Sequence, residues 1–153
     1  THYPNVGENF KPYGIQKHRH TIEIQETLSH STGGQTTVQF TPHLLPVDRG
    51  ILTSLYGIPV KKITQKDLEE TYQEYYGDEF FIRLINEAPQ IKHVRGTNYV
   101  DIAVFYDQRT DNIMIFSAID NLVKGAAGQA VQNMNLMLGF KEQEGLELIP
   151  LMP

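Results

Sequence analysis

Alternation of apolar and polar residues is clearest near the middle of the chain. Every second residue from Val100 to Tyr106 is apolar, and a polar turn at residues 107–112 leads into a second apolar run at 113–118. Alternation is typical of a half-buried strand, and two strand-like runs joined by a short polar turn predict a β-hairpin.

Helical spacing appears in two earlier segments. Residues 20–29 predict a helix with Thr21 as its cap, and the Ser-Thr-Gly-Gly run that follows at 31–34 would end it. Thr64-Gln-Lys-Asp67 is similar to a capping box, with Asp in place of the preferred Glu or Gln. It predicts a second, amphipathic helix that stops at Gly77.

Strands are also predicted at residues 37–41, where apolar and polar residues alternate, and in the apolar segments 51–58 and 80–85, and residues 86–98 read as a loop. Strands joined by tight turns, with helices between them, favour an α+β class. We expect a mainly antiparallel or mixed sheet with helices layered on it.

The most informative pattern lies in the last predicted helix, residues 121–138, which begins at an Asp120/Asn121 cap. One of its stripes is apolar: Val123, Ala127, Ala130, Val131, Met134 and Leu138. A second stripe holds small or amide residues: Gly125, Gly128, Gln132 and Asn135. An interior helix glycine costs roughly 1 kcal/mol against alanine, so two of them a turn apart suggest that something approaches the backbone closely. That partner is either another protein segment or a ligand.

The composition argues against several classes of function. The chain has 153 residues, enough for one domain, and a net charge of −5 with no basic run, which argues against nucleic-acid binding. It has no cysteine, which excludes disulfides, thiolate metal sites and a cysteine nucleophile within this chain and favours a cytoplasmic protein. Because it opens on Thr1 rather than Met, we expect it to be excised from a longer polypeptide.

His18-Arg19-His20 is the densest polar cluster of the sequence. A guanidinium can bind phosphate or carboxylate through two hydrogen bonds, and a neighbouring imidazole can transfer protons. The alternatives are an exposed basic loop, a histidine that caps a helix, or a weak metal site at His18 and His20. A second cluster, on the proline-rich segment 40–50, contains His43, Asp48 and Arg49, and its alternative is a structural turn.

Together these segments resemble the C-terminal catalytic domain of N-acetyl-gamma-glutamyl-phosphate reductase, over about residues 9–148. The matching motifs are His18-Arg-His-Thr21, Phe40-Thr-Pro-His-Leu-Leu-Pro46 with Arg49-Gly-Ile-Leu52, Val94-Arg-Gly-Thr-Asn98 and Ser117-Ala-Ile-Asp-Asn-Leu-Val-Lys-Gly-Ala-Ala-Gly-Gln-Ala-Val-Gln-Asn-Met-Asn135. The resemblance implies the fold of the C-terminal domains of glyceraldehyde-3-phosphate dehydrogenase-like enzymes. It also implies an arginine-biosynthesis enzyme that uses NADPH to reduce an acyl phosphate to an aldehyde through a cysteine thioester.

The same resemblance assigns roles to residues. His20 matches the acid/base partner, and Arg19 and Arg49 are candidates for binding the substrate's phosphate or carboxylate. In the family the long helix borders the nicotinamide site, so its first residues Asn121, Lys124 and Gly125 become cofactor-side candidates.

The family enzyme has a nucleophilic cysteine and an N-terminal dinucleotide-binding domain that this chain lacks. We therefore expect a single substrate-binding and dimerisation domain, residues 1–153, that is inactive alone and forms homo-oligomers. Its C-terminal helix would pack on the missing domain, and in isolation that helix would be hidden by self-association or displaced. The alternative is a non-enzymatic oligomerisation module of the same fold.

Overall fold

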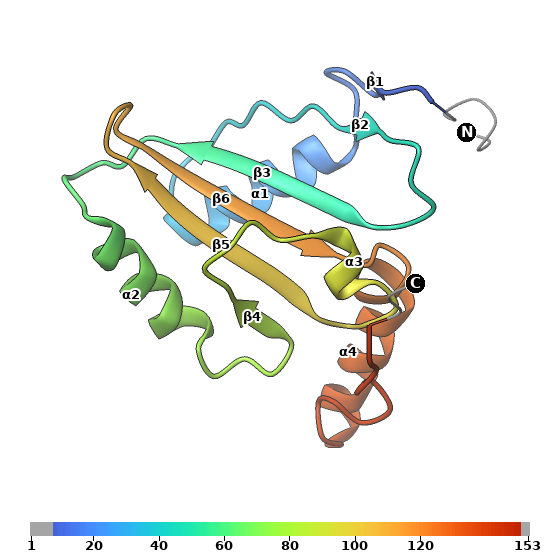
Figure 1. The fold of residues 1–153 in the computed structure, drawn as a ribbon. Helices are drawn as coiled ribbons and strands as arrows, with labels where there is room; N and C mark the ends of the chain where they lie inside the picture. The colour runs from blue at the N-terminus through green and yellow to red at the C-terminus, as the bar shows by residue number, and fades with distance from the viewer. Residues whose placement is uncertain (1–7, 151–153) are drawn as a thin grey trace. The chain divides into compact units, whose positions relative to one another are not determined.

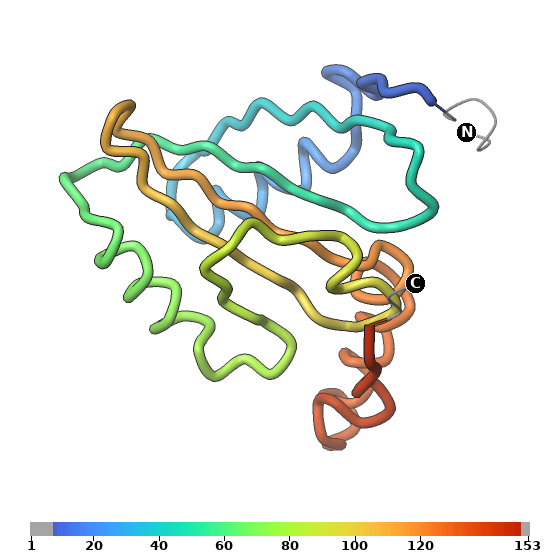
Figure 2. The backbone as a smooth tube through the Cα atoms, viewed as in Figure 1, coloured from blue at the N-terminus to red at the C-terminus, as the bar shows by residue number. Residues whose placement is uncertain are grey.

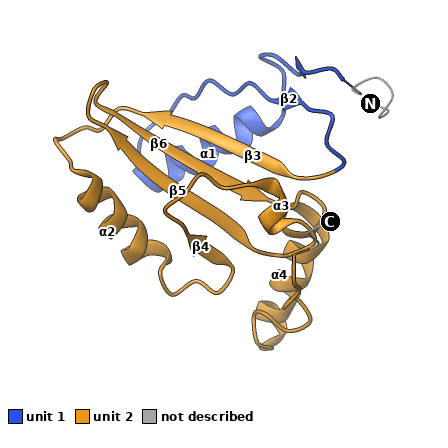
Figure 3. Cartoon of the chain, viewed as in Figure 1, with its two compact units in different colours: residues 1–48 blue, residues 49–153 orange. Residues whose placement is uncertain are grey.

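The computed structural model describes residues 8–150 of the chain. These fall into two compact units, residues 1–48 and 49–153 (Figure 3). The order of elements along the chain can be followed in Figure 1. The prediction of a single domain over residues 1–153 stays a prediction.

Over its described residues, 8–48, the first unit contains one helix and a two-stranded ladder. Strand β1 (Lys11–Pro12) pairs antiparallel with β2 (His43–Leu44). Helix α1 (His20–Thr32) begins where the sequence predicts and runs three residues past the expected end. It stops at Gly33, whose φ of 69° is a left-handed conformation that suits glycine.

Two sequence predictions in this unit are wrong. The N-cap of α1 is Arg19 rather than Thr21, and it makes no side-chain cap bond. The segment 37–41 is not part of a strand ladder. Instead, the Val38 backbone N–H donates to Gln25 Oε1 on α1. This N–H group is therefore already satisfied and is not available to pair with a neighbouring strand.

The second unit is built on a four-stranded sheet of order β3-β6-β5-β4. Its strands are β3 (Ile51–Gly57), β4 (Ile82–Leu84), β5 (Val100–Asp107) and β6 (Asn112–Ile119). β5 and β6 form the predicted hairpin, β3 pairs antiparallel with β6, and β4 pairs parallel with β5. The prediction of a mixed sheet with helices is confirmed.

Helix α2 (Gln65–Tyr76) begins at the predicted capping box. Thr64 Oγ1 accepts the Asp67 backbone N–H, and Asp67 Oδ2 accepts the Thr64 backbone N–H at 2.7 Å. Asp thus performs the task usually given to Glu or Gln. The helix ends at Gly77, as predicted.

The first residue of α2 also closes an open edge of the sheet. β4 pairs with β5 only as far as Ile102, so the next backbone groups of β5 lack a strand partner on that side. The Gln65 carboxamide accepts the Tyr106 N–H at 2.7 Å and donates to the Val104 carbonyl at 2.9 Å. A side-chain amide therefore replaces the peptide group of a missing strand.

Two helical segments follow. The expected loop 86–98 contains a four-residue helix, α3 (Ile91–Val94). The long C-terminal helix begins as a π-helical turn, Val123–Ala127, and continues as α4 (Gly128–Leu138). Figure 2 shows the chain leaving β6, forming this helix and then turning back through the segment 139–150.

The core of the second unit is small and partly polar. Its buried apolar residues are Leu68, Phe81, Val94, Ala103, Ala118 and Leu146. Its buried polar residues are Thr97, Asn98, Asp101, Asp120, Gln132 and Asn135. Several of these polar residues gather where β6 meets the C-terminal helix, which is where the candidate site lies.

Candidate functional site

Strand pairing brings together two short segments that are distant in sequence. β3 and β6 pair in antiparallel register with Ile51 opposite Ile119. The residues just before β3, Arg49 and Gly50, therefore lie beside the residues just after β6. Those residues are Asp120 and Asn121, the predicted start of the long helix.

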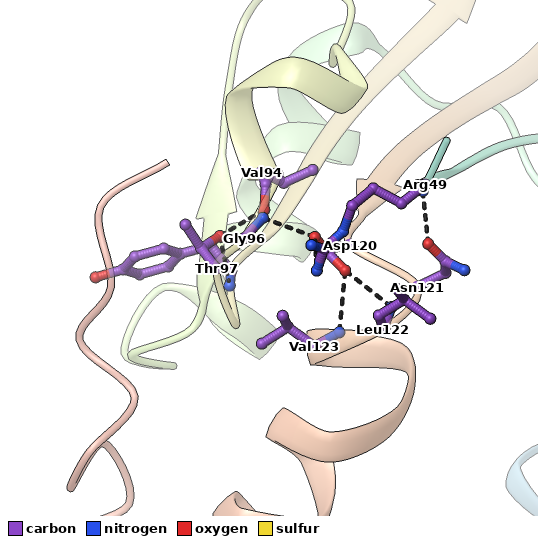
Figure 4. A network of polar contacts seen from close by, with 10 residues as sticks. Arg49, Val94, Gly96, Thr97, Asp120, Asn121, Leu122 and Val123 are labelled. Atoms are coloured by element: carbon purple, nitrogen blue, oxygen red, sulfur yellow. Dashed lines mark hydrogen bonds and ion pairs between the residues drawn. The ribbon is translucent and has the colours of Figure 1, made fainter. Parts of the chain in front are cut away.

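Asp120 is the centre of this arrangement (Figure 4). Its side chain is fully buried, and its Oδ2 lies 2.7 Å from Nη2 of Arg49 and accepts the Gly96 backbone N–H at 2.6 Å. Its Oδ1 accepts the backbone N–H groups of Leu122 at 2.8 Å and Val123 at 3.0 Å. We call these five residues the Asp120 cluster.

The contacts of Asp120 determine its charge state. Burial alone would raise the pKa of this carboxyl group, because a charge is poorly solvated inside a protein. The Arg49 side chain and the backbone N–H groups of Gly96, Leu122 and Val123 outweigh that effect and hold the pKa of Asp120 below its ordinary value. The carboxylate is therefore a stable anion near neutral pH.

Asn121 holds the backbone next to Arg49 by a hydrogen bond. Its Oδ1 accepts the Gly50 backbone N–H at 2.6 Å. Gly50 has φ +117°, and a Cβ there would lie 2.1 Å from Cγ2 of Ile91, so this position requires glycine. Asp120 and Asn121 thus hold a side chain and the adjacent main chain of one short segment.

The start of the long helix is irregular. The Gly125 N–H bonds to the Asp120 carbonyl and the Ala127 N–H to the Leu122 carbonyl, each five residues back. π-helical turns of this kind occur frequently at functional sites. Because Asp120 already accepts the N–H groups of Leu122 and Val123, these two amides are not free to bind a phosphate.

Three of the four residues in the stripe of small and amide residues face the protein. Gly128, Gln132 and Asn135 are buried, and a Cβ at Gly128 would lie 2.4 Å from Oδ1 of Asn98. The Asn98 Nδ2 and the Lys124 Nζ both donate to Gln132 Oε1 at 2.8 Å. Close approach at Gly128 is therefore explained by protein packing.

Gly125 differs from Gly128. It is exposed, and a Cβ there would meet nothing nearer than 3.6 Å. Nothing packed around it within the described chain requires a glycine. The apolar stripe of the same helix is also largely uncovered, with Met134 47% and Leu138 64% exposed.

Lys124 lies beside Gly125 but its side chain turns inward. Besides its bond to Gln132, its Nζ lies 5.4 Å from the centre of the Phe81 ring. Burial lowers the pKa of Lys124, while Glu142 and Glu79 favour its charged form.

The histidine cluster belongs to the first unit. His18 Nδ1 accepts the backbone N–H of His20, the first residue of α1, at 3.3 Å. The rings of His18 and Phe40 meet edge to face at 5.4 Å. The His20 side chain is 46% exposed, with its Nε2 3.8 Å from Oε2 of Glu23.

The structure thus gathers four of the six predicted site residues, Arg49, Asn121, Lys124 and Gly125, within the second unit. Arg19 and His20 lie next to each other in the first unit. The roles predicted for all six stay predictions. Sequence reasoning anticipated Asp120 only as a helix cap and placed Asn98 only at the end of a predicted loop.

Residues 8–150 contain no group of three or more His, Cys, Asp or Glu side chains placed to hold a metal ion. Over the same range, no helix is both long enough and apolar enough to cross a membrane.

Comparison with known proteins defines the family. Residues 1–121 match the model of the family described as "Semialdehyde dehydrogenase, dimerisation domain". The chain belongs to this family.

Curated relatives give a finer comparison. The chain is 49% identical over 153 residues to the N-acetyl-gamma-glutamyl-phosphate reductase of Lachnoclostridium phytofermentans, covering 99% of this chain and 44% of that protein. It is 52% identical over 145 residues to the reductase of the same name from Caldicellulosiruptor bescii, covering 94% of this chain and 42% of that protein. The chain therefore spans less than half the length of the relatives it matches.

Solved structures of similar fold are found among aspartate semialdehyde dehydrogenases. The aspartate semialdehyde dehydrogenase of Francisella tularensis matches with a TM-score of 0.65 and 17% identity, over 87% of this chain and 40% of that one. Aspartate semialdehyde dehydrogenase II of Vibrio cholerae matches with a TM-score of 0.63 and 20% identity, over 79% of this chain and 37% of that one. At these identities the likeness establishes the fold.

Proposed function

We propose that this chain is the substrate-binding and dimerisation part of an N-acetyl-gamma-glutamyl-phosphate reductase of arginine biosynthesis. The observation that carries the proposal is identity of about 50% to reductases of that name over nearly the whole chain. The reaction breaks the bond between the acyl carbon and the phosphate oxygen and replaces the phosphate with a hydride. Its products are an aldehyde and inorganic phosphate.

His20 is our candidate for the acid/base group. A proton must be supplied or removed as the carbonyl oxygen and the leaving phosphate change charge, and imidazole does this near neutral pH. The His20 ring is about half exposed, so it is accessible, while its backbone is fixed at the start of α1 by His18. Such a group contributes roughly 10²–10⁴-fold to a rate.

Arg19 and Arg49 are our candidates for binding the anionic groups of the substrate. The substrate carries both a phosphate and a carboxylate, and guanidinium binds either with directed hydrogen bonds. Arg19 is exposed at the entrance to α1. Arg49 is 22% exposed and held by Asp120 through Nη2, so the rest of its planar fork is fixed in direction.

An NADPH site is our proposal for the helix start, at Asn121, Lys124 and Gly125. They suit the uncharged, amide-bearing part of the cofactor rather than its phosphates, since the helix-start amides are already bonded to Asp120. The open backbone at Gly125 leaves room for a flat group, and the carboxamide of Asn121 retains N–H donors. NADPH, when bound, supplies the hydride. The three residues would border it, with Lys124 held by Gln132.

The uncovered apolar stripe of α4 suits a protein partner. Exposed apolar surface of this kind marks an interaction site. We propose that it packs on a dinucleotide-binding domain supplied by the same longer polypeptide, which would also supply the cysteine nucleophile. We further propose a cytoplasmic location and a homo-oligomer.

The test uses the longer polypeptide that carries this chain. Wild-type protein should reduce N-acetyl-gamma-glutamyl phosphate with NADPH, and His20→Ala should lower kcat by roughly 10²-fold or more while leaving NADPH affinity almost unchanged. His30→Ala, which removes an exposed histidine near the end of α1, is the matched control and should retain activity. A wild-type protein without this activity would refute the function, and an active His20→Ala protein would refute the role of His20.

A second candidate is a non-enzymatic oligomerisation module. The family description, a dimerisation domain, favours it. The two functions separate in one experiment, because the module predicts stable oligomers of the longer polypeptide with no NADPH oxidation.

A further inference from the structure

The Asp120 cluster joins residues from three separate parts of the second unit. Arg49 precedes β3, Gly96 lies in the turn before β5, and Leu122 with Val123 begins the long helix. One buried carboxylate accepts hydrogen bonds from all of them (Figure 4). Removing any single bond would leave the others in place, but removing the carboxylate would release all three segments together.

Two of these segments carry candidate site residues. On one side of Asp120 is the Arg49 guanidinium, our substrate-side cation. On the other side is the helix start, where Leu122 and Val123 separate Asn121 from Lys124 and Gly125, our cofactor-side residues. A rotation of this helix start would move all three cofactor-side residues at once.

We propose that Asp120 is a positioning residue that couples Arg49 to the cofactor-side helix start. It thereby holds substrate and cofactor in a fixed position relative to each other. The inference rests on the proposed function. Asp120 acts through two separate arms, its ion pair with Arg49 and its bonds to the amides of Leu122 and Val123. The two arms should therefore affect different ligands.

Asp120→Asn in the longer polypeptide tests this proposal. The amide has no negative charge, which weakens the hydrogen bonds of both arms, and its NH2 group faces the N–H donors of one arm instead of accepting from them. We expect the KM for N-acetyl-gamma-glutamyl phosphate and the KM for NADPH each to rise about tenfold, because small misplacements of site groups have large kinetic effects.

The Arg49→Met background separates the arms. If Asp120 acts on the acyl phosphate through Arg49, Asp120→Asn should change that KM by less than about twofold once Arg49 is gone. Its effect on the KM for NADPH should persist at about tenfold, because that arm runs through backbone amides. A merely structural role would give the same effects in both backgrounds.

Asp101→Asn is the matched control, because Asp101 is also almost fully buried and its Oδ1 lies 2.6 Å from Nε of Arg83. It should lower thermal stability and leave both KM values unchanged. Should Asp120→Asn fail to fold, Asp120→Glu keeps the charge but displaces it by one methylene, and the same rises in KM are expected.

Three results decide the matter. A folded Asp120→Asn or Asp120→Glu protein with both KM values near wild type would overturn the inference while leaving the proposed function intact. So would an acyl-phosphate effect of equal size with and without Arg49. A wild-type protein that cannot reduce the acyl phosphate would remove the proposed function and this inference with it.

Discussion

The two helix glycines should respond in opposite directions to alanine. Gly125 and Gly128 lie one turn apart, but only Gly128 is crowded. A Cβ at Gly128 would lie 2.4 Å from Asn98 Oδ1, 2.7 Å from Val123 Cγ1 and 2.8 Å from the Val123 carbonyl oxygen. A Cβ at Gly125 would lie 3.6 Å or more from every neighbour, which is an ordinary contact distance.

The magnitudes follow from two terms. Replacing an interior helix glycine by alanine gains up to about 1 kcal/mol at either position. At Gly128 the methyl group would overpack against a backbone oxygen and a buried amide, a cost of about 3 kcal/mol. Gly125→Ala should therefore stabilise the chain by up to about 1 kcal/mol, and Gly128→Ala should destabilise it by about 2 kcal/mol.

Thermal melting of the isolated chain, followed by circular dichroism, measures both effects. At about 2–4 °C per kcal/mol for a chain of this size, Gly125→Ala should raise Tm by up to about 4 °C and Gly128→Ala should lower it by about 4–8 °C. Combining Gly128→Ala with Asn98→Ala should cost less than the sum of the two single changes, because the second removes the clashing oxygen. A raised Tm for Gly128→Ala, or strict additivity, would refute the packing explanation.

Three further predictions concern stability and association. The folded-state pKa of Asp120 lies below its ordinary value of 3.8. The ionised carboxylate therefore stabilises the folded chain above pH 3.8, and this stabilisation is lost as the pH falls through the folded-state pKa. Acid unfolding of wild type should thus be steeper below about pH 4 than that of Asp120→Asn, and equal slopes would contradict this. Thr64→Ala removes the cap of α2 and should lower the free energy of unfolding, measured in urea, by about 1 kcal/mol. Thr71→Ala in the same helix is the control and should not have this effect. An equal loss of stability in both variants would show that the cap is unimportant. The isolated chain should self-associate with rising concentration in sedimentation, and Met134→Glu with Leu138→Glu should reduce this; a wild-type monomer at every concentration would exclude it.

Local patterns in the sequence predicted much of the fold. The β5–β6 hairpin follows from an alternating run and a second apolar run on the two sides of a polar turn, and α2 follows from a cap whose bonds are made within four residues. Such elements are determined by neighbouring residues, so a single sequence reveals them. The family resemblance, carried by long motifs, is likewise confirmed by the reductases that the chain matches.

What the sequence concealed depends on distant partners. The segment 37–41 has strand-like alternation, yet Gln25 on the helix takes the Val38 N–H. The ion pair between Arg49 and Asp120 joins residues far apart in the chain, and the sequence shows Asp120 only as a cap. The roles of Gly125 and Gly128 cannot be told apart by spacing, since the difference lies in where Asn98 sits.

The carboxamide of Gln65 has a consequence for how this sheet can grow. A strand edge with unpaired backbone groups can hydrogen-bond to an extended segment of another chain, and sheets aggregate in this way. Here the bonds at Val104 and Tyr106 are already satisfied, so a foreign strand arriving beyond the end of β4 would have to displace α2 first. One glutamine thereby protects this edge against aggregation, and it does so without a strand, a proline or a charge.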